Sequence, residues 1–551
     1  MAATLITPLS AVGILLVICL TGWRLRNVGR RPDGMPPGPA TLPVLGNLHQ
    51  IPARNAHLQF RKWADEYGPV YSIMLGTIPT VVLTSDVAVR DLLEKRGQIY
   101  SDRPDMFLSQ VVASGNLRLV VMRYGDSWRL IHRLVHNILN ISVAAKYIPY
   151  QDLESKYLLG GLLDTPESFK QHLRRFAFSL STQLIFGYRC PSYTDPRIEK
   201  LFQIFEGWAK VSESGAGKIA DVYPILQSLP RFLLPGVREA EHVHKIGRKL
   251  YTDQWLAAKE DLKNGKGTPC ICNDLLLAQQ SEGLSDEVVA YIVGSLLEGG
   301  SDTTSATTYG FVEAMMCFPE AQKKAQEEID RVVGSDRLPT IDDYPDLPYI
   351  RCVIKETLRW MPPVILGVPH RVTKDDEYMG WKIPKDATVL NNVWGIQMDP
   401  IRSPNPRHFL PERHLGDTTT LYESARGDPL KRDNFNFGAG RRMCQGVHIA
   451  ERSLFLAMSR ILWGFNIEKP LDANGAPITP DIDDFEGGIA VTPAPFGVEI
   501  KARSVERTEI MKRALEDCEG LIDAATGQWK KPPEGMPFGA APYSGGFREK
   551  E

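Results

Sequence analysis

The sequence has 551 residues, of which 43% are hydrophobic and 24% are charged, as is usual for a globular protein. Lys and Arg number 64 and Asp and Glu number 66, so the formal net charge is −2. These values exclude a disordered chain, a collagen and an all-membrane bundle, and they provide no overall positive field that would attract nucleic acid. Eight cysteines without a repeated spacing argue against a disulfide scaffold and indicate a reducing compartment.

Residues 1–23 are predicted to be an N-terminal transmembrane helix. Residues 4–23 are uncharged and mostly apolar, and a helix of about 20 such residues spans a bilayer. A cleaved secretory signal is the alternative, but the N-terminus lacks a positive region and no small-residue cleavage site follows Leu20. Four arginines follow directly, at positions 24, 26, 30 and 31, which predicts a single-pass protein with a cytosolic body. Residues 24–46, basic and then rich in Pro and Gly, are expected to form a hinge.

Helix is expected to dominate the body. Residues 70–75 and 80–83 predict a hairpin, and short extended pieces are expected between residues 364 and 411. Helical periodicity runs through residues 86–96, 126–140, 170–186, 239–263, 285–317, 319–333 and 448–463. The expected fold class is therefore mainly α with small β-sheets (α+β). It forms one catalytic domain over residues 47–503, followed by a peripheral C-terminal extension over residues 504–551.

A glycine-rich loop around Cys444 contains the densest chemical signal. Residues 437–446 read FGAGRRMCQG. Because Gly tolerates positive φ and lacks a side chain, three glycines beside a cysteine predict a turn whose backbone approaches a flat group or a sulfur atom. The start of the following helix would stabilise a Cys444 thiolate as a metal ligand, whereas a buried unreactive cysteine is the ordinary alternative. The string fits Phe-x-x-Gly-x-Arg-x-Cys-x-Gly at every fixed position and resembles the haem-ligand loop of the cytochrome P450 family.

A second motif lies inside the long helix expected over residues 285–317, where residues 299–304 read GGSDTT. Glycines and β-branched residues within a helix each cost up to about 1 kcal/mol. One explanation is close packing against a neighbouring helix, and the other is that a flat macrocycle lies against Gly300. The motif resembles the oxygen-activating segment of the same family. This resemblance implies that Asp302 and Thr303 are catalytic and relay protons during oxygen activation.

The resemblance also implies the remaining site residues. Cys444 would be the axial ligand of the iron in haem b, with Phe437 in the same loop, and Glu356, Arg359 and Arg413 would form a structural triad, with His414 replacing the usual Phe. The expected contacts to the haem propionates are Trp128, His132 or Arg133, Arg371 and Arg442. The family usually has Arg at the position of His132, so the choice between His132 and Arg133 stays open. The family topology places Phe107, Val364, Leu366, Val368 and Ile489 around the substrate pocket.

The motifs occur in family order over roughly residues 36–503. Their residues resemble those of microsomal enzymes of fungal specialised metabolism. They imply a haem-dependent monooxygenase that inserts one atom of O2 into an apolar small molecule by hydroxylation or epoxidation. Electrons would come from NADPH through a separate reductase, with cytochrome b5 as a further donor, at the endoplasmic reticulum membrane. No nucleic acid partner is expected. A haem-thiolate isomerase or dehydratase, a peroxide-driven peroxygenase and a haem sensor are the alternatives. The intact Asp302–Thr303 pair argues against the isomerase and the sensor.

Overall fold

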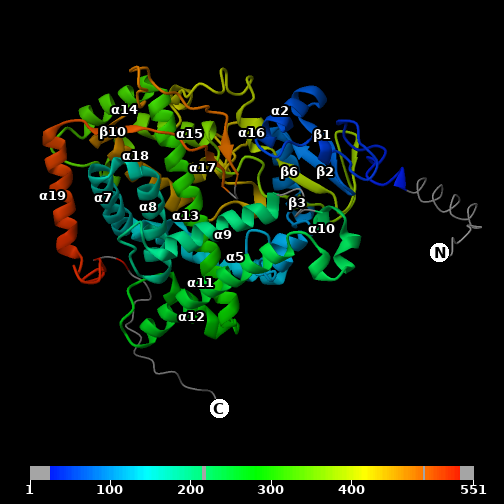
Figure 1. The fold of residues 1–551 in the computed structure, drawn as a ribbon, viewed down its shortest axis with the longest axis horizontal. Helices are drawn as coiled ribbons and strands as arrows, with labels where there is room; N and C mark the ends of the chain where they lie inside the picture. Colours follow the sequence, from blue (N-terminus) through cyan, green and yellow to red (C-terminus); the bar gives the residue numbers. More distant parts are fainter. Residues whose placement is uncertain (1–24, 214–218, 488–489, 534–535, 537–551) are drawn as a thin grey trace, which may run out of the picture.

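The computed structural model describes residues 25–213, 219–487, 490–533 and 536. A large helical part is joined to a smaller part that contains the main sheet (Figure 1). None of the helices in the described ranges is long and apolar enough to cross a bilayer. The transmembrane helix predicted for residues 1–23 lies outside the described residues.

Helices make up most of the described chain, as predicted. The longer ones are α2 (Ala56–Tyr67), α5 (Asp126–Leu139), α7 (Ile148–Asp164), α8 (Phe169–Phe186), α9 (Pro196–Glu213), α11 (Val237–Lys263), α12 (Ile271–Glu282), α13 (Asp286–Cys317), α14 (Pro319–Val332), α15 (Pro348–Trp360), α18 (Val447–Gly464) and α19 (Val505–Leu521). The short α-helices are α3 (Asp86–Val89), α4 (Gly97–Tyr100), α6 (Ile141–Ala144), α10 (Ile219–Val222), α16 (Val393–Gln397) and α17 (Leu421–Arg426). Single helical turns are η1 (Leu48–Gln50), η4 (Ala145–Tyr147), η5 (Pro166–Ser168), η6 (Pro224–Ser228), η7 (Arg231–Leu233), η8 (Ile341–Asp346), η9 (Pro411–His414), η10 (Gly440–Arg442) and the π-helical η2 (Arg90–Lys95) and η3 (Phe107–Val112). The helix predicted over residues 86–96 is therefore split at Arg90.

The main sheet has four strands in the order β1-β2-β6-β3. Its strands are β1 (Val70–Leu75), β2 (Ile78–Leu83), β6 (Thr388–Asn391) and β3 (His370–Arg371). The predicted hairpin is present as the antiparallel pair β1–β2, and β2 pairs with β6 in parallel. Three antiparallel two-stranded pairs complete the set: β4 (Asp376–Tyr378) with β5 (Trp381–Ile383), β7 (Phe465–Glu468) with β10 (Glu499–Ala502), and β8 (Phe485–Glu486) with β9 (Thr492–Pro493).

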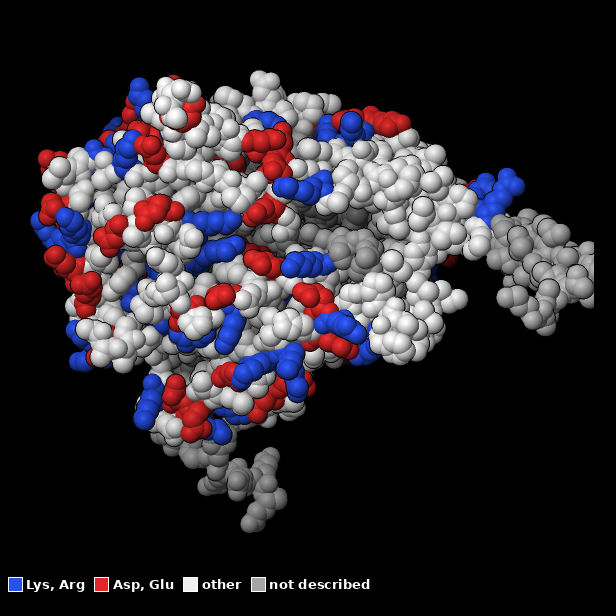
Figure 2. Space-filling view, viewed as in Figure 1, with Lys and Arg blue, Asp and Glu red and all other residues white. Residues whose placement is uncertain are grey.

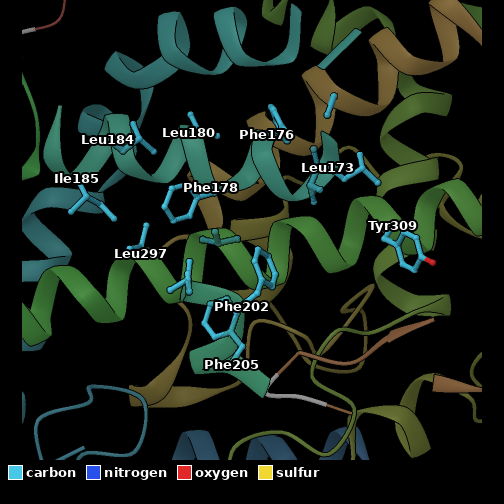
Figure 3. Packing of buried hydrophobic residues seen from close by; sticks show 14 of the residues in the cluster. Leu173, Phe176, Phe178, Leu180, Leu184, Ile185, Phe202, Phe205, Leu297 and Tyr309 are labelled. Atoms are coloured by element: carbon cyan, nitrogen blue, oxygen red, sulfur yellow. The ribbon is translucent and has the colours of Figure 1, made fainter. Parts of the chain in front are cut away.

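The core is built around α13, which packs against α8, α11 and α18. The helix begins at an N-cap, Ser285, whose hydroxyl accepts a hydrogen bond from Val288 N at 3.3 Å. On α8, Phe178 is directed toward α13 and Phe176 away from it, while Phe205 of α9 lies on the other side of α13 (Figure 3). Each such aromatic or aliphatic side chain contributes roughly 1.5–3 kcal/mol by leaving water, so this packing holds the position of α13.

The C-terminal extension was expected to be peripheral, and its described part makes defined contacts with the body. Helix α19 lies along α7 (Figure 1), where a Cβ atom on Gly160 would come within 2.8 Å of Leu515. Beyond α19, Trp529 Nε1 donates to Gln183 Oε1 of α8 at 2.7 Å. The polar groups of Gln528 bond to both the backbone N and O of Arg189. The extension therefore packs against the body, because its apolar and polar groups find partners on α7, on α8 and at Arg189 just after α8.

Candidate active site

The loop before α18 holds Cys444 in a tight turn. Gly438 and Gly440 have φ of 72° and 61°, in the left-handed region that favours glycine. A Cβ atom on Gly440 would lie 2.2 Å from Leu93 O, so a side chain there would displace the backbone. Cys444 N donates to Phe437 O at 2.8 Å, which closes the turn. The glycines therefore bring the loop against its neighbour and present the thiol just before the helix.

Cys444 differs from the other described cysteines because it is the only exposed one. Burial nevertheless raises the pKa of its thiol, and the backbone N–H of Gly446 opposes the rise. The thiol is thus surrounded by protein atoms but still has accessible surface. It therefore faces a space inside the protein. A bound iron cation would reverse the effect of burial, since a coordinating thiol is deprotonated.

Helix α13 leaves one face open. Between residues 289 and 316, this described helix retains accessible surface only at Ser295, Leu296, Gly299, Gly300, Asp302 and Thr303. Their spacing of three or four residues places them on one side of the helix. A Cβ atom on Gly299 would meet no atom within 4 Å. We call these six residues the open stripe.

Gly300 does not have the surroundings that the sequence predicted. A Cβ atom on Gly300 would lie 2.5 Å from Ser181 Oγ on α8. Close helix packing therefore explains this glycine, and the glycine that faces open space is Gly299. The two explanations considered from the sequence apply to two adjacent glycines.

Asp302 and Thr303 lie together on the open stripe. The Thr303 hydroxyl donates to Gly299 O at 2.7 Å, which holds its oxygen on the helix surface. Asp302 Oδ2 accepts from Ala490 N at 3.3 Å. Burial raises the pKa of Asp302 to about 7, while the Ala490 N–H and the charge of Arg174 oppose the rise. Asp302 can therefore hold or release a proton near neutral pH.

Aromatic and cationic groups converge around Arg442, which belongs to the Cys444 loop. The Arg442 guanidinium carbon lies 4.2 Å from the Trp128 ring centroid, and the His132 ring lies 4.5 Å from the same ring. Arg442 Nε and Nη2 donate to the carbonyl oxygens of Ser101 and Met122. Its Nη1 atom is buried and has no hydrogen-bond partner among the described residues. This orphaned donor indicates a missing anionic partner, because an unpaired buried donor is costly.

Arg103 and His370 belong to this cationic cluster and were missed from the sequence. Arg103 Nη1 donates to the carbonyls of Val368 and Pro369, each at 2.7 Å. Burial lowers the pKa of Arg103 well below its usual value, and nearby Arg442 lowers it further. Burial also lowers the pKa of His370, with Arg103 as the next cause. The available signals were the Arg103-Pro104 step and the position of His370 next to Arg371, but neither specifies that the side chains meet.

The predicted propionate donors fall into two groups in the structure. His132 lies four residues after Trp128, on the same helix face, whereas Arg133 pairs with Glu282 at 3.1 Å and its side chain is 62% exposed. Arg371 bonds to Asp386 through Nε at 2.9 Å and has two further aspartates within 4 Å. Trp128, His132 and Arg442 therefore converge, while Arg133 and Arg371 are engaged by acidic groups.

The Glu356 carboxylate joins the residues predicted as a triad. Arg359 Nε and Nη2 reach its two oxygens at 2.7 Å each, and Arg413 Nε lies 3.3 Å from Oε1. His414 Nε2 lies 3.0 Å from Oε2. His414, which replaces the usual Phe, is therefore a fourth member of this group, because the short η9 turn places it beside Arg413.

The described residues predicted to line the substrate pocket are all half-buried. Phe107 is half-buried in η3, and residues 364–369 are all half-buried, although residues 361–363 and 370 are buried. This run contains Val364, Leu366 and Val368. Ile489 lies outside the described residues.

A cysteine thiol at a helix start, a long helix with an open acid–alcohol pair and a buried cationic cluster define a haem-thiolate protein. The residues fit haem: Cys444 would hold the iron, and Trp128, Arg442 and Arg103 would receive the propionates. The family model described as Cytochrome P450 matches residues 36–500, and the chain belongs to this family.

Three similar proteins are named as cytochrome P450 monooxygenases of fungi. The chain is 49% identical to virE of Hypocrea virens over 93% of each chain. It is 46% identical to fogE of Aspergillus ruber over 97% of this chain and 98% of that protein. It is also 46% identical to fsoB of Humicola fuscoatra over 95% and 97%. The protein is a monooxygenase that uses haem b, O2 and electrons from NADPH delivered by a reductase partner.

Proposed function

We propose that this monooxygenase hydroxylates or epoxidises an apolar small molecule in fungal specialised metabolism. The observation that carries the proposal is the Asp302–Thr303 pair beside the open face of Gly299. An isomerase or dehydratase would not need this pair, and neither would a sensor. The fungal monooxygenases to which the chain is similar support the setting. Half-buried aliphatic residues at 364–369 support an apolar substrate.

The chain's own residues would supply protons and exclude water, while bound haem supplies the iron at which O2 is activated. Thr303, tied to Gly299 O, would hold its hydroxyl toward the reacting oxygen. Asp302 would replenish the proton because its pKa of about 7 lets it exchange near neutral pH. Arg174, whose charge acts on Asp302, lines a pocket of about 330 Å³ between α8 and α9 together with Glu206.

We also propose that the protein is a single-pass protein of the endoplasmic reticulum with its catalytic domain in the cytosol. Residues 1–23 would be the anchor, and cytochrome b5 would be an additional electron donor. An apolar surface supports the membrane assignment: Ile225, Phe232 and Leu233 are 81%, 76% and 57% exposed. This surface is attached to the hinge, since Tyr223 OH donates to Val44 O at 2.9 Å. Figure 2 shows few charged side chains around α10, beside η6 and η7. Loss of membrane sedimentation on deletion of residues 1–23 tests the anchor.

The decisive experiment is the spectrum of the dithionite-reduced, carbon-monoxide-bound microsomal protein, followed by turnover with NADPH and reductase. We expect a strongly red-shifted Soret band that disappears in Cys444→Ser, and NADPH-dependent oxygen insertion into product. A histidine-like band despite full haem incorporation would contradict the Cys444 assignment. Turnover with peroxide alone, but not with NADPH and reductase, would favour the peroxygenase.

A further inference from the structure

A buried ion pair lies at the upstream end of the open stripe. Arg118 precedes Leu119, whose backbone N donates to Ser295 Oγ of the stripe at 3.2 Å. The Arg118 side chain is 2% exposed, and its Nη1 lies 2.9 Å from Oε1 of Glu298, which is 8% exposed. Glu298 directly precedes Gly299 on α13. The loop that carries Arg118 is therefore fixed against the helix that bears Asp302 and Thr303.

Two of the three guanidinium nitrogen atoms of the buried Arg118 make no hydrogen bond with a described residue. Its Nε and Nη1 atoms have no hydrogen-bond partner in the described part of the chain. Its short approach to Glu298 is thus an ion pair without a directed hydrogen bond from Nη1. The same Glu298 oxygen already accepts a hydrogen bond from Tyr251 OH of α11. The Glu298 carboxylate therefore balances the charge of Arg118, but N–H donors of the Arg118 guanidinium group stay unpaired.

A second unpaired donor lies beside the first. The Arg118 guanidinium carbon is 5.2 Å from the Trp208 ring centroid on α9. Trp208 Nε1 is buried and also has no partner among the described residues. Two buried donor groups without acceptors at one place need an explanation, and an unseen acceptor is the simplest one.

The other titratable groups around this place provide no free charge. His244 of α11 shares a hydrogen bond of 2.7 Å with Tyr291 OH of α13. Burial lowers the pKa of His244, and the charge of Arg248 lowers it further, so the ring is neutral at pH 7. Burial raises the pKa of Tyr251, and the charge of Glu298 raises it further. Arg118 is therefore the cation that meets a ligand here, and it favours an oxygen acceptor, anionic or neutral.

We propose that Arg118 and Trp208 bind an oxygen substituent at one end of the substrate and so position the other end for oxidation. This inference rests on the proposed function and narrows its substrate class. The substrate would be an apolar molecule with a hydroxyl, carbonyl or carboxylate oxygen remote from the oxidised carbon.

The test compares matched probes that differ by one hydroxyl group. Binding of naphthalene and 2-naphthol, and of biphenyl and 4-hydroxybiphenyl, is measured by equilibrium dialysis against the full-length holoenzyme. We expect the hydroxylated member to bind at least about 10-fold more tightly in at least one pair. Arg118→Leu should abolish this preference and leave hydrocarbon affinity within about twofold, whereas Arg118→Lys should retain part of it.

Two further variants keep the test independent of folding. Arg118→Leu leaves the Glu298 carboxylate without a counter-charge, so the double variant Arg118→Leu/Glu298→Leu replaces the whole pair by apolar groups, which proteins tolerate better. Arg175→Leu is the matched control, because Arg175 is equally buried and pairs with Glu154 on α7, away from the stripe. This control should keep the full preference for the hydroxylated probe.

An unchanged preference in both Arg118→Leu and the double variant would overturn the proposal. The absence of any preference or binding in all pairs with wild-type protein would also overturn it, and would indicate that water alone satisfies these donors. Dialysis measures binding without turnover. A failed carbon monoxide spectrum therefore refutes the proposed function, and a failed hydroxyl preference refutes only the role of Arg118.

Discussion

Replacement of Glu356 by Gln should strongly destabilise the catalytic domain. The carboxylate is fully buried and accepts hydrogen bonds from Arg359, Arg413 and Leu410 N, and it lies 3.0 Å from His414. Burial alone would raise its pKa, but the hydrogen bonds from Arg359 and His414 outweigh burial and lower the pKa from 4.5 to about 2. That difference corresponds to about 3 kcal/mol of stability at neutral pH.

The substitution removes the negative charge and leaves two guanidinium groups without a counter-charge. Breaking a buried pair in this way costs about 3–5 kcal/mol, which agrees with the value from the pKa. Because the folded-state pKa is depressed, the contribution is complete above pH 4.5 and is lost as the pH falls toward 2. Glu356→Gln should therefore unfold at lower urea concentration at pH 7 and show a weaker acid dependence between pH 4.5 and 2.

Equilibrium urea unfolding of the holoenzyme, followed by the Soret band and by far-UV circular dichroism, measures both effects. Glu412→Gln, on the η9 turn that also carries Arg413, is the control, since Glu412 pairs with the half-exposed Lys324 and its substitution should cost less than about 1 kcal/mol. The reasoning fails if Glu356→Gln unfolds within about 1 kcal/mol of wild type and keeps the same acid dependence.

Three further predictions concern the proton relay and the C-terminal extension. Thr303→Ala should consume NADPH with little product, whereas Thr307→Ala, one turn further along, should stay coupled; wild-type product yield in Thr303→Ala would refute the relay. If Asp302 delivers protons in its acid form, coupled turnover should fall as the pH rises through about 7, and Asp302→Asn should be slower and lack this titration, as a pH profile of product formation would show. Trp529→Ala should lower the free energy of unfolding by about 1–3 kcal/mol, because the half-buried ring and its hydrogen bond to α8 are lost; unchanged urea unfolding would mean that the extension is not part of the cooperative unit.

Signals within a few residues were sufficient to predict six of the twelve longer described helices, the β1–β2 hairpin and the turn around Cys444. Glycines around Cys444 specify a turn because positive φ is a property of single residues. The pairing of Glu356 with Arg359 follows from a separation of three residues on one helix. Helix periodicity likewise located α13 and α18, because apolar spacing records which face of a helix is buried.

Contacts between distant segments were decided by the tertiary structure alone. The meeting of Arg103, His370 and Arg442 depends on how three segments are packed, and no short-range pattern encodes it. Ser181 on α8 determines that Gly300 is a packing glycine while Gly299 faces open space. The extension is docked for the same reason, since Trp529 finds its partner on a helix more than 300 residues earlier. The sequence by itself determined which residues can carry the chemistry, and the packing of the chain determined which of them meet.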